Sequence, residues 1–185
     1  MAPPSAGLHT AVAVAAIVCA LPAGAAEPTG APALGTVTGT LTLDGTAISL
    51  HNAVAIAYRN PIVEVNMLMV ALAPGPVVAD PRPGEWPTER LDQEVTTGIT
   101  IEMNDAAHCV SLVIRHPSLG GQRLAKVGFK VCEPGAIKIV GSTRVEGRVR
   151  SSPDGAEETI SGHRVRYSLT FNAPATKWAP AARDH

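Results

Sequence analysis

Residues Thr36-Val-Thr-Gly-Thr-Leu-Thr-Leu43, followed by Asp44-Gly45, decide the fold class of this chain. Apolar side chains alternate with threonine through much of this run, which is the period of a strand with one buried face. Asp-Gly is a frequent hairpin turn because glycine adopts a positive φ without steric cost. The stretch therefore predicts a β-strand that ends in a tight turn.

Strand-like patterns recur along the rest of the chain. Further strands are predicted over 48–58, 62–72, 99–103, 109–115, 126–132, 136–140, 143–150 and 163–171. The run 62–72 is apolar on both faces, as in a central strand that is covered on both sides. A single helical turn over 88–93 is the only helical signal after residue 26. We expect an all-β fold, an antiparallel, immunoglobulin-like β-sandwich of about 8–9 strands, with a small β-barrel as the alternative.

The first 26 residues have the pattern of an export signal. Their apolar core, 11–21, is too short to span a bilayer, and Ala23-Gly24-Ala25 matches the small-x-small cleavage pattern. The absence of Lys and Arg before the core is atypical, and lipidation at Cys19 or a buried N-terminal helix are the alternatives. Cleavage near Ala25 or Ala26 would deliver a periplasmic or secreted chain with no transmembrane span. We expect a flexible segment 27–35, a single β domain 36–172 and a loose tail 173–185.

Two cysteines, Cys109 and Cys132, remain after cleavage, and an even pair in an oxidising compartment predicts a disulfide. Placing them opposite each other across a hairpin matches apolar residues with apolar residues and puts both sulfurs on the other face. The matched pairs are then Val110 with Val131, Leu112 with Phe129, and Ile114 with Val127. Two buried free thiols are the alternative.

Candidate catalytic residues do not form a recognisable motif. The histidines lack metal-ligand spacing, and there is no nucleophile elbow, so neither a metal nor a cofactor is expected. Nothing in the pattern selects two of the available carboxylates as a catalytic pair. Met67 and Met69 lie between aliphatic residues and are predicted to fill the core. The histidines considered are His51, His108, His116 and His163, and the carboxylates are Glu64, Glu102, Asp105 and Glu146.

Two segments are predicted contact surfaces. The first is a ribbon of outward-facing arginines, Arg144, Arg148, Arg150, Arg164 and Arg166, suited to an anionic envelope component such as lipopolysaccharide or teichoic acid, or to another protein. A solvated surface is the alternative. The second is the proline-rich loop 73–97, with Glu85, Trp86 and Arg90. With 3% aromatic residues and a net charge of −1, the chain is not expected to bind nucleic acid.

The hairpin Gly39-Thr-Leu-Thr-Leu-Asp-Gly45, leading into Leu50-His-Asn-Ala-Val-Ala55, resembles the opening of a loose group of uncharacterised bacterial exported proteins. Val145-Glu-Gly-Arg-Val149 and Phe171-Asn-Ala-Pro174 resemble their last third. The resemblance implies a shared β fold and carries no catalytic residues. We therefore expect an exported module that binds or has a structural role in the cell envelope, rather than an enzyme. An envelope hydrolase with loop-borne residues is one alternative, and a small-molecule or lipid carrier with an apolar cavity is another.

Overall fold

The computed structural model describes residues 35–60, 62–77, 86–128 and 131–177. Contacts divide the chain into two units, Met1–Gly30 and Ala31–His185, and every described residue belongs to the second. The expected signal peptide over 1–26, the segment 27–34, Glu85 and the tail from 178 lie outside the described residues. Export and its cleavage site therefore stay predictions.

The described part of the chain contains eleven strands and one α-helix, and the all-β class is confirmed. The helix, α1, spans Pro87–Glu94, and a short 3-10 turn covers Pro117–Leu119. The strands are β1 (Gly35–Leu43), β2 (Thr46–Ile48), β3 (Asn52–Arg59), β4 (Asn66–Ala73), β5 (Gly98–Asn104), β6 (Cys109–Arg115), β7 (Arg123–Val127), β8 (Ile137–Val140), β9 (Arg144–Arg150), β10 (Glu158–Ile160) and β11 (His163–Lys177).

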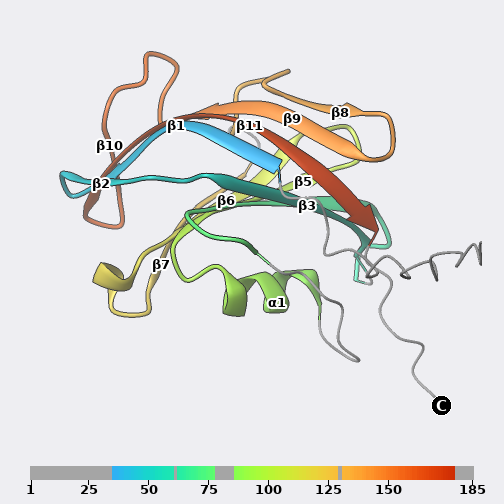
Figure 1. The fold of residues 1–185 in the computed structure, drawn as a ribbon, viewed down its shortest axis with the longest axis horizontal. Helices are drawn as coiled ribbons and strands as arrows, with labels where there is room; N and C mark the ends of the chain where they lie inside the picture. The colour runs from blue at the N-terminus through green and yellow to red at the C-terminus, as the bar shows by residue number, and fades with distance from the viewer. Residues whose placement is uncertain (1–34, 61, 78–85, 129–130, 178–185) are drawn as a thin grey trace, which may run out of the picture. The chain divides into compact units, whose positions relative to one another are not determined.

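All eleven strands belong to one sheet. The order is β7-β6-β5-β4-β3-β1-β11-β9-β8, with β2 paired to β1 and β10 paired to β11. The sheet curls into a half-barrel, so that β1, β9 and β11 arch over β3 to β6 (Figure 1). Two separate sheets, as in an immunoglobulin-like sandwich, are not confirmed.

The curl depends on a junction between β3 and β11. The long strand β11 pairs antiparallel with β1, passes the start of β1 and then pairs parallel with β3, with Ala175 opposite Ala55. Gly35, the first residue of β1, lies in this junction, and a Cβ there would be 1.9 Å from the Asn172 carbonyl oxygen. Small residues at these positions therefore allow three strands to meet closely.

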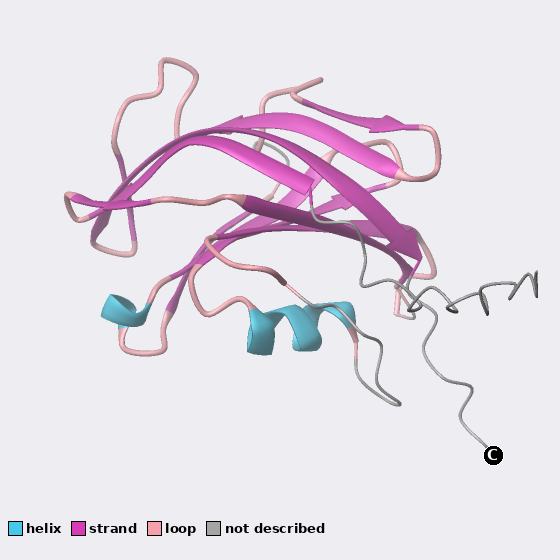
Figure 2. Ribbon diagram, viewed as in Figure 1, coloured by secondary structure: helices cyan, strands magenta, loops and turns pink. Residues whose placement is uncertain are grey.

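The two faces of the sheet are covered differently. The inner face encloses the main core, in which Leu41, Val70 and Tyr167 are fully buried. The helix α1 lies against the outer face of β3 and β4, below the sheet in Figure 2, and Leu91 and the following Val95 contribute its side of a second core. Burial on both faces explains the apolar composition of β4 and confirms the central strand over 66–72, including the core placement of its methionines. Residues 62–65, predicted to belong to the same strand, instead form an exposed turn.

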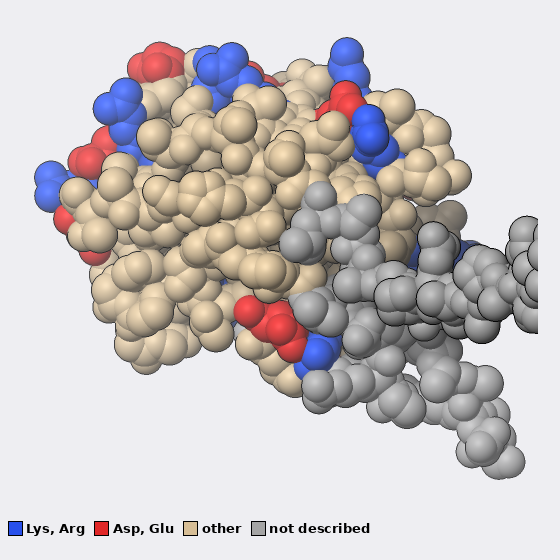
Figure 3. Space-filling view, in the orientation of Figure 1, with Lys and Arg blue, Asp and Glu red and all other residues tan. Residues whose placement is uncertain are grey.

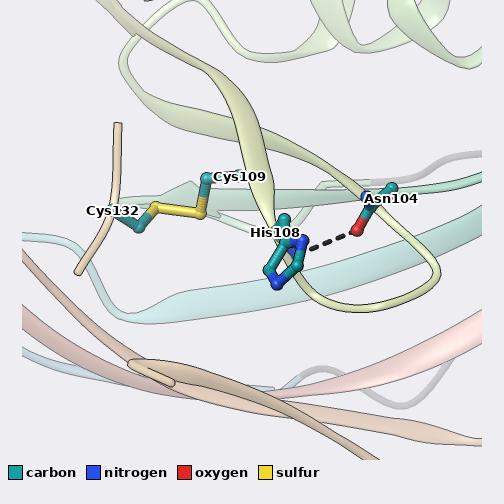
Figure 4. The surroundings of a disulfide bond; sticks show 4 residues. All are labelled: Asn104, His108, Cys109 and Cys132. Carbon is teal, nitrogen blue, oxygen red and sulfur yellow. Dashed lines mark hydrogen bonds between the residues drawn. A yellow bond between two sulfur atoms is a disulfide. The ribbon is translucent and has the colours of Figure 1, made fainter. Parts of the chain in front are cut away.

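Cys109 and Cys132 form the expected disulfide (Figure 4), but the predicted hairpin register is wrong. Ile114 pairs with Leu124 and Leu112 with Lys126, three residues away from the expected register, which inverts the parity. Val127, expected to face Ile114, is 80% exposed.

The connection 116–122, which contains the short 3-10 turn, sets this register by placing Arg115 opposite Arg123. A separate feature, a β-bulge in β6, changes the face on which Cys109 lies. Glu102 pairs with Ser111, but the next residue, Met103, pairs with Cys109, so Val110 is the extra residue. The bulge places Cys109 on the inner face, in the main core, instead of on the opposite face as predicted. Cys132 lies after β7 has ended, because β7 spans Arg123–Val127 rather than 126–132.

Two further boundaries differ from the prediction. The helix α1 occupies eight residues of the segment expected to be a loop, because Leu91 and Val95 have an apolar sheet face to cover. Glu89 caps it by accepting a hydrogen bond from the Trp86 backbone N–H at 3.2 Å. The last strand continues to Lys177, so residues 173–177 are not a loose tail. No helix in the described segments is long and apolar enough to cross a membrane.

Candidate functional site

An apolar pocket of about 610 Å³ opens at the end of the half-barrel where β11 terminates, and we call it the end pocket. Its walls come from both sides of the curled sheet, with Leu68 on one side and Ile139 and Val145 on the other. Ala57 and Ala175 lie where β3 and β11 converge, and their short side chains leave this space unfilled. The remaining lining residues are Tyr58, Arg59, Asn66, Met67, Asp105, Ser142 and Lys177.

Charged side chains line the end pocket only at its rim. Arg59 and Lys177 are exposed basic residues, and Asp105 is the one acidic residue among those that line the pocket. The Arg59 guanidinium lies 3.8 Å from the Glu64 carboxylate, and both side chains are largely exposed. Such an exposed pair interacts weakly, so Arg59 keeps hydrogen-bonding capacity for a ligand. The pocket thus combines an apolar interior with a net basic rim.

The turn between β3 and β4 stands beside the end pocket and displays aliphatic side chains to solvent. Ile62, Val63 and Val65 are 88%, 60% and 45% exposed. The Asn60 side-chain oxygen accepts hydrogen bonds from the backbone N–H groups of Ile62 and Val63, at 2.9 and 3.3 Å. A backbone bond of 2.9 Å from Asn60 N–H to the Val65 carbonyl oxygen closes the turn. These hydrogen bonds fix the backbone conformation of the turn, and its apolar side chains point toward solvent.

A second hollow, of about 560 Å³, adjoins this turn and shares Asn66, Met67 and Asp105 with the end pocket. Glu64 and Asp105 both line it, which brings together two of the carboxylates considered from the sequence. Both residues are exposed to solvent. Glu64 lies in the turn between β3 and β4, and Asp105 lies in the turn between β5 and β6.

Glu102 is committed to a network on the outer face of the sheet. Its carboxylate accepts a short hydrogen bond from the Tyr58 hydroxyl and another from the Ser111 hydroxyl at 3.3 Å. Burial and the neighbouring Glu102 carboxylate raise the pKa of Tyr58 well above its usual range, so the phenol stays protonated and donates. These side-chain hydrogen bonds link β3, β5 and β6 to one another.

The histidines do not converge on a site. His163 Nδ1 lies 2.7 Å from the Asp44 carboxylate and joins the turn before β2 to the turn before β11. The His116 side chain accepts a hydrogen bond from the Ser118 backbone N–H and so caps the short 3-10 turn. His51 and His108 are exposed. Within the described residues, no three His, Cys, Asp or Glu side chains form a group that could hold a metal ion.

The five predicted arginines all point to the outer face of the sheet, yet they do not make one compact patch. Arg144 lies opposite Pro174 and Arg150 opposite Ser168, so Arg144 and Arg164 are about 33 Å apart along β11. Acidic residues lie near several of them, as Figure 3 shows along the edge that carries β8 to β10. Glu146 belongs to β9, two residues from Arg144 on the same face, whereas Glu133 and Glu157 come from loops and had no signal in the sequence. The pairs are Arg144 with Glu146 at 3.7 Å, Arg150 with Glu133 at 3.3 Å, and Arg164 with Glu157 at 3.8 Å.

Two of these arginines have no acidic partner in the described part of the chain. Arg166 donates to the Gly155 carbonyl oxygen at 2.9 Å. Arg148 is exposed beside a shallow groove of about 440 Å³, which Thr38, Lys138 and Thr170 also line. Most of the residues that line the groove are polar, and the groove lies on the opposite face of the sheet from the end pocket.

Of the residues predicted to form the contact loop, Trp86 is accessible to solvent and Arg90 is not. Trp86 is partly exposed at the start of α1. Arg90 is buried and forms an ion pair of 2.6 Å with Glu94, so it is not available as a surface contact.

Comparison with models of protein families, with curated proteins and with solved structures gave no match, so the site is interpreted from this chain alone.

Proposed function

We propose that this domain binds a single amphipathic small molecule, with the apolar part in the end pocket and an anionic head group at its rim. The observation that carries the proposal is an apolar cavity of about 610 Å³ that two exposed basic residues, Arg59 and Lys177, flank. Ligand pockets in proteins commonly have this volume, a mostly apolar lining and a few polar groups that orient the ligand. A long-chain carboxylate has the matching chemistry.

A binding role is favoured over a hydrolytic one by the character of the lining. The wall residues Leu68, Ile139 and Val145 offer neither a nucleophile nor a proton donor. The charged groups sit at the solvent boundary, where they select a head group but have no bond to break within reach. The domain is thus a carrier or sensor of its ligand.

We also propose that the half-barrel works as an incomplete barrel rather than as a sandwich. The Lys126 ammonium donates to both oxygens of Glu158, at 3.1 and 2.9 Å, and so links β7 to β10 across the gap in the sheet. Barrels of this size enclose a ligand between their walls. The end pocket takes the place of such an interior.

The proposal is tested with an anionic apolar fluorophore, anilinonaphthalene sulfonate, and a fluorescent long-chain fatty acid. Both are expected to bind at one site, and Ala57→Phe, which fills the pocket, is expected to abolish the signal while the variant keeps its β circular dichroism. Arg59→Glu is expected to weaken binding about threefold to fivefold.

A matched control exists for the charge change. Arg164 is 64% exposed and 3.8 Å from its carboxylate partner, and Arg59 is 65% exposed at the same distance from its own. Arg164 begins β11 and Lys177 ends it, so Arg164 lies far from the pocket. Arg164→Glu should leave binding unchanged. Equal loss in both arginine variants, or full binding by Ala57→Phe, would refute the proposal.

Export to the periplasm or the medium stays part of the proposed role. The Cys109–Cys132 disulfide supports it, because such bonds persist in oxidising compartments. N-terminal sequencing of the protein recovered from the envelope or medium should begin close to Glu27. Recovery of an uncleaved chain in the cytoplasm would contradict export.

A further inference from the structure

The pocket-bearing end of the half-barrel also carries most of the exposed aliphatic surface. The structure describes five large hydrophobic residues that are exposed, and four of them lie at this end, three in one turn and one at the end of a strand. Ile62, Val63 and Val65 belong to the β3–β4 turn, and Val140 ends β8, between the pocket residues Ile139 and Ser142. The fifth, Val127, ends the edge strand β7. The end pocket therefore opens between the apolar β3–β4 turn and the end of β8.

We propose that this end of the molecule docks on a lipid surface, so that the end pocket faces the membrane and exchanges its ligand with the bilayer. The clustering of exposed aliphatic residues around one opening marks an interaction surface. The purpose of docking rests on the proposed function, but the docking itself is measured independently of ligand binding.

The turn geometry supports insertion as a preformed unit. Asn60 holds the backbone N–H groups of Ile62 and Val63, and Glu64 adopts a left-handed conformation with φ of 55°. A non-glycine residue is rarely found there and persists where surrounding contacts enforce it. Since the side chains are already held outward, little conformational entropy is lost when they enter an apolar phase.

The charges around this end indicate which lipid surface it fits. Among the residues that line the end pocket and the adjoining hollow, the basic Arg59 and Lys177 are balanced by the acidic Glu64 and Asp105. Arg59 lies 3.8 Å from Glu64, and Arg144 lies 3.7 Å from Glu146. A balanced ring has little attraction for an anionic surface, so insertion of aliphatic side chains must supply the affinity. The surface is therefore a net-neutral, zwitterionic bilayer, and binding should depend little on salt.

The test is flotation of the disulfide-bonded protein with phosphatidylcholine vesicles. Partitioning is expected to be similar at low and high salt, and to gain little when phosphatidylglycerol is added. Ile62→Ser is expected to lower the partition coefficient roughly tenfold, since Ile62 is 88% exposed in solution and would be buried in lipid.

A positional control keeps the overall hydrophobicity constant. Adding Thr46→Ile to Ile62→Ser restores an aliphatic side chain in the exposed strand β2, which pairs with the end of β1 that lies about 27 Å from Gly35. Ile62 is beyond the other end of β1, because β3 runs on from Gly35 toward the β3–β4 turn. This double variant should partition as poorly as Ile62→Ser alone. Recovery of partitioning by the double variant would mean that general hydrophobicity drives binding, and would overturn the proposal.

Ligand binding in the absence of vesicles separates the two proposals. Ile62→Ser should bind the fluorescent fatty acid normally, and Ala57→Phe should still partition into vesicles. Normal ligand binding without vesicle binding would overturn docking and leave the proposed function standing. Self-association that Ile62→Ser abolishes, without vesicle binding, would identify this end of the molecule as a protein contact and would equally overturn docking.

Discussion

The disulfide allows a quantitative prediction about stability. Cys109 and Cys132 are 23 residues apart, and closing a loop of this length lowers the entropy of the unfolded chain. The chain-entropy model gives about 3 kcal/mol for such a loop. Changing both cysteines to alanine should therefore lower the free energy of unfolding by about 3 kcal/mol. For a domain of this size that corresponds to a fall in Tm of about 6–12 °C.

Alanine is the appropriate replacement because Cys109 is 7% exposed and belongs to the main core. Serine would add the cost of a buried hydroxyl group to that of the lost bond. Urea unfolding followed by circular dichroism measures the difference.

Reduction supplies an internal control for the same measurement. Dithiothreitol should bring the unmodified protein to the stability of the double alanine variant and leave that variant unchanged. A stability loss of less than about 1 kcal/mol would refute the loop-entropy reasoning. Alkylation of both thiols in the native, unreduced protein would refute the disulfide itself.

Two further predictions concern packing and pH. Gly147→Ala should destabilise the fold by about 1–3 kcal/mol in thermal unfolding, because the added Cβ would lie 2.8 Å from the Phe171 ring. Gly75→Ala is the control and should change the stability little, because no atom lies within 4 Å of the added Cβ. Equal effects of the two substitutions would contradict the packing argument. The hydrogen bond with His163 holds the pKa of Asp44 below its ordinary value of 3.8. Since the folded-state pKa is the lower one, Asp44 stabilises the fold above its ordinary pKa and loses that contribution as pH falls through the lowered value. Asp44→Asn should therefore lower Tm at neutral pH and have no effect in strong acid; a difference that persists in acid would argue against the ionised carboxylate as the cause.

The strand pattern could be predicted where one face is buried and the other is polar. In β1, Leu41 and Leu43 alternate with threonine, and the structure buries the leucines as expected. The helix α1 was expected as a single turn because its eight residues are too short for a clear helical period. Its apolar contacts with the sheet decide its length.

The candidate site was beyond the reach of a sequence pattern. Ala57 and Ala175 are unremarkable alanines in alternating strands, and they belong to a pocket only because β11 passes the end of β1 and meets β3. Arg59 and Lys177 are brought to one rim by the same junction. The exposed Ile62 and Val63 were included in a predicted buried strand, and the turn formed by Asn60 removes them from it.

By itself, the sequence determined the all-β class, the main strands and the pairing partners of the disulfide, because alternation and cysteine number are local properties of the chain. The tertiary structure decided how those strands close on one another. The face on which Cys109 lies depends on a bulge at Val110 in the pairing of β6 with β5, and the choice between a sandwich and a half-barrel depends on the parallel pairing of β11 with β3. Period-two alternation encodes neither feature, because it is compatible with either arrangement. The pocket exists only where those contacts bring the strands together.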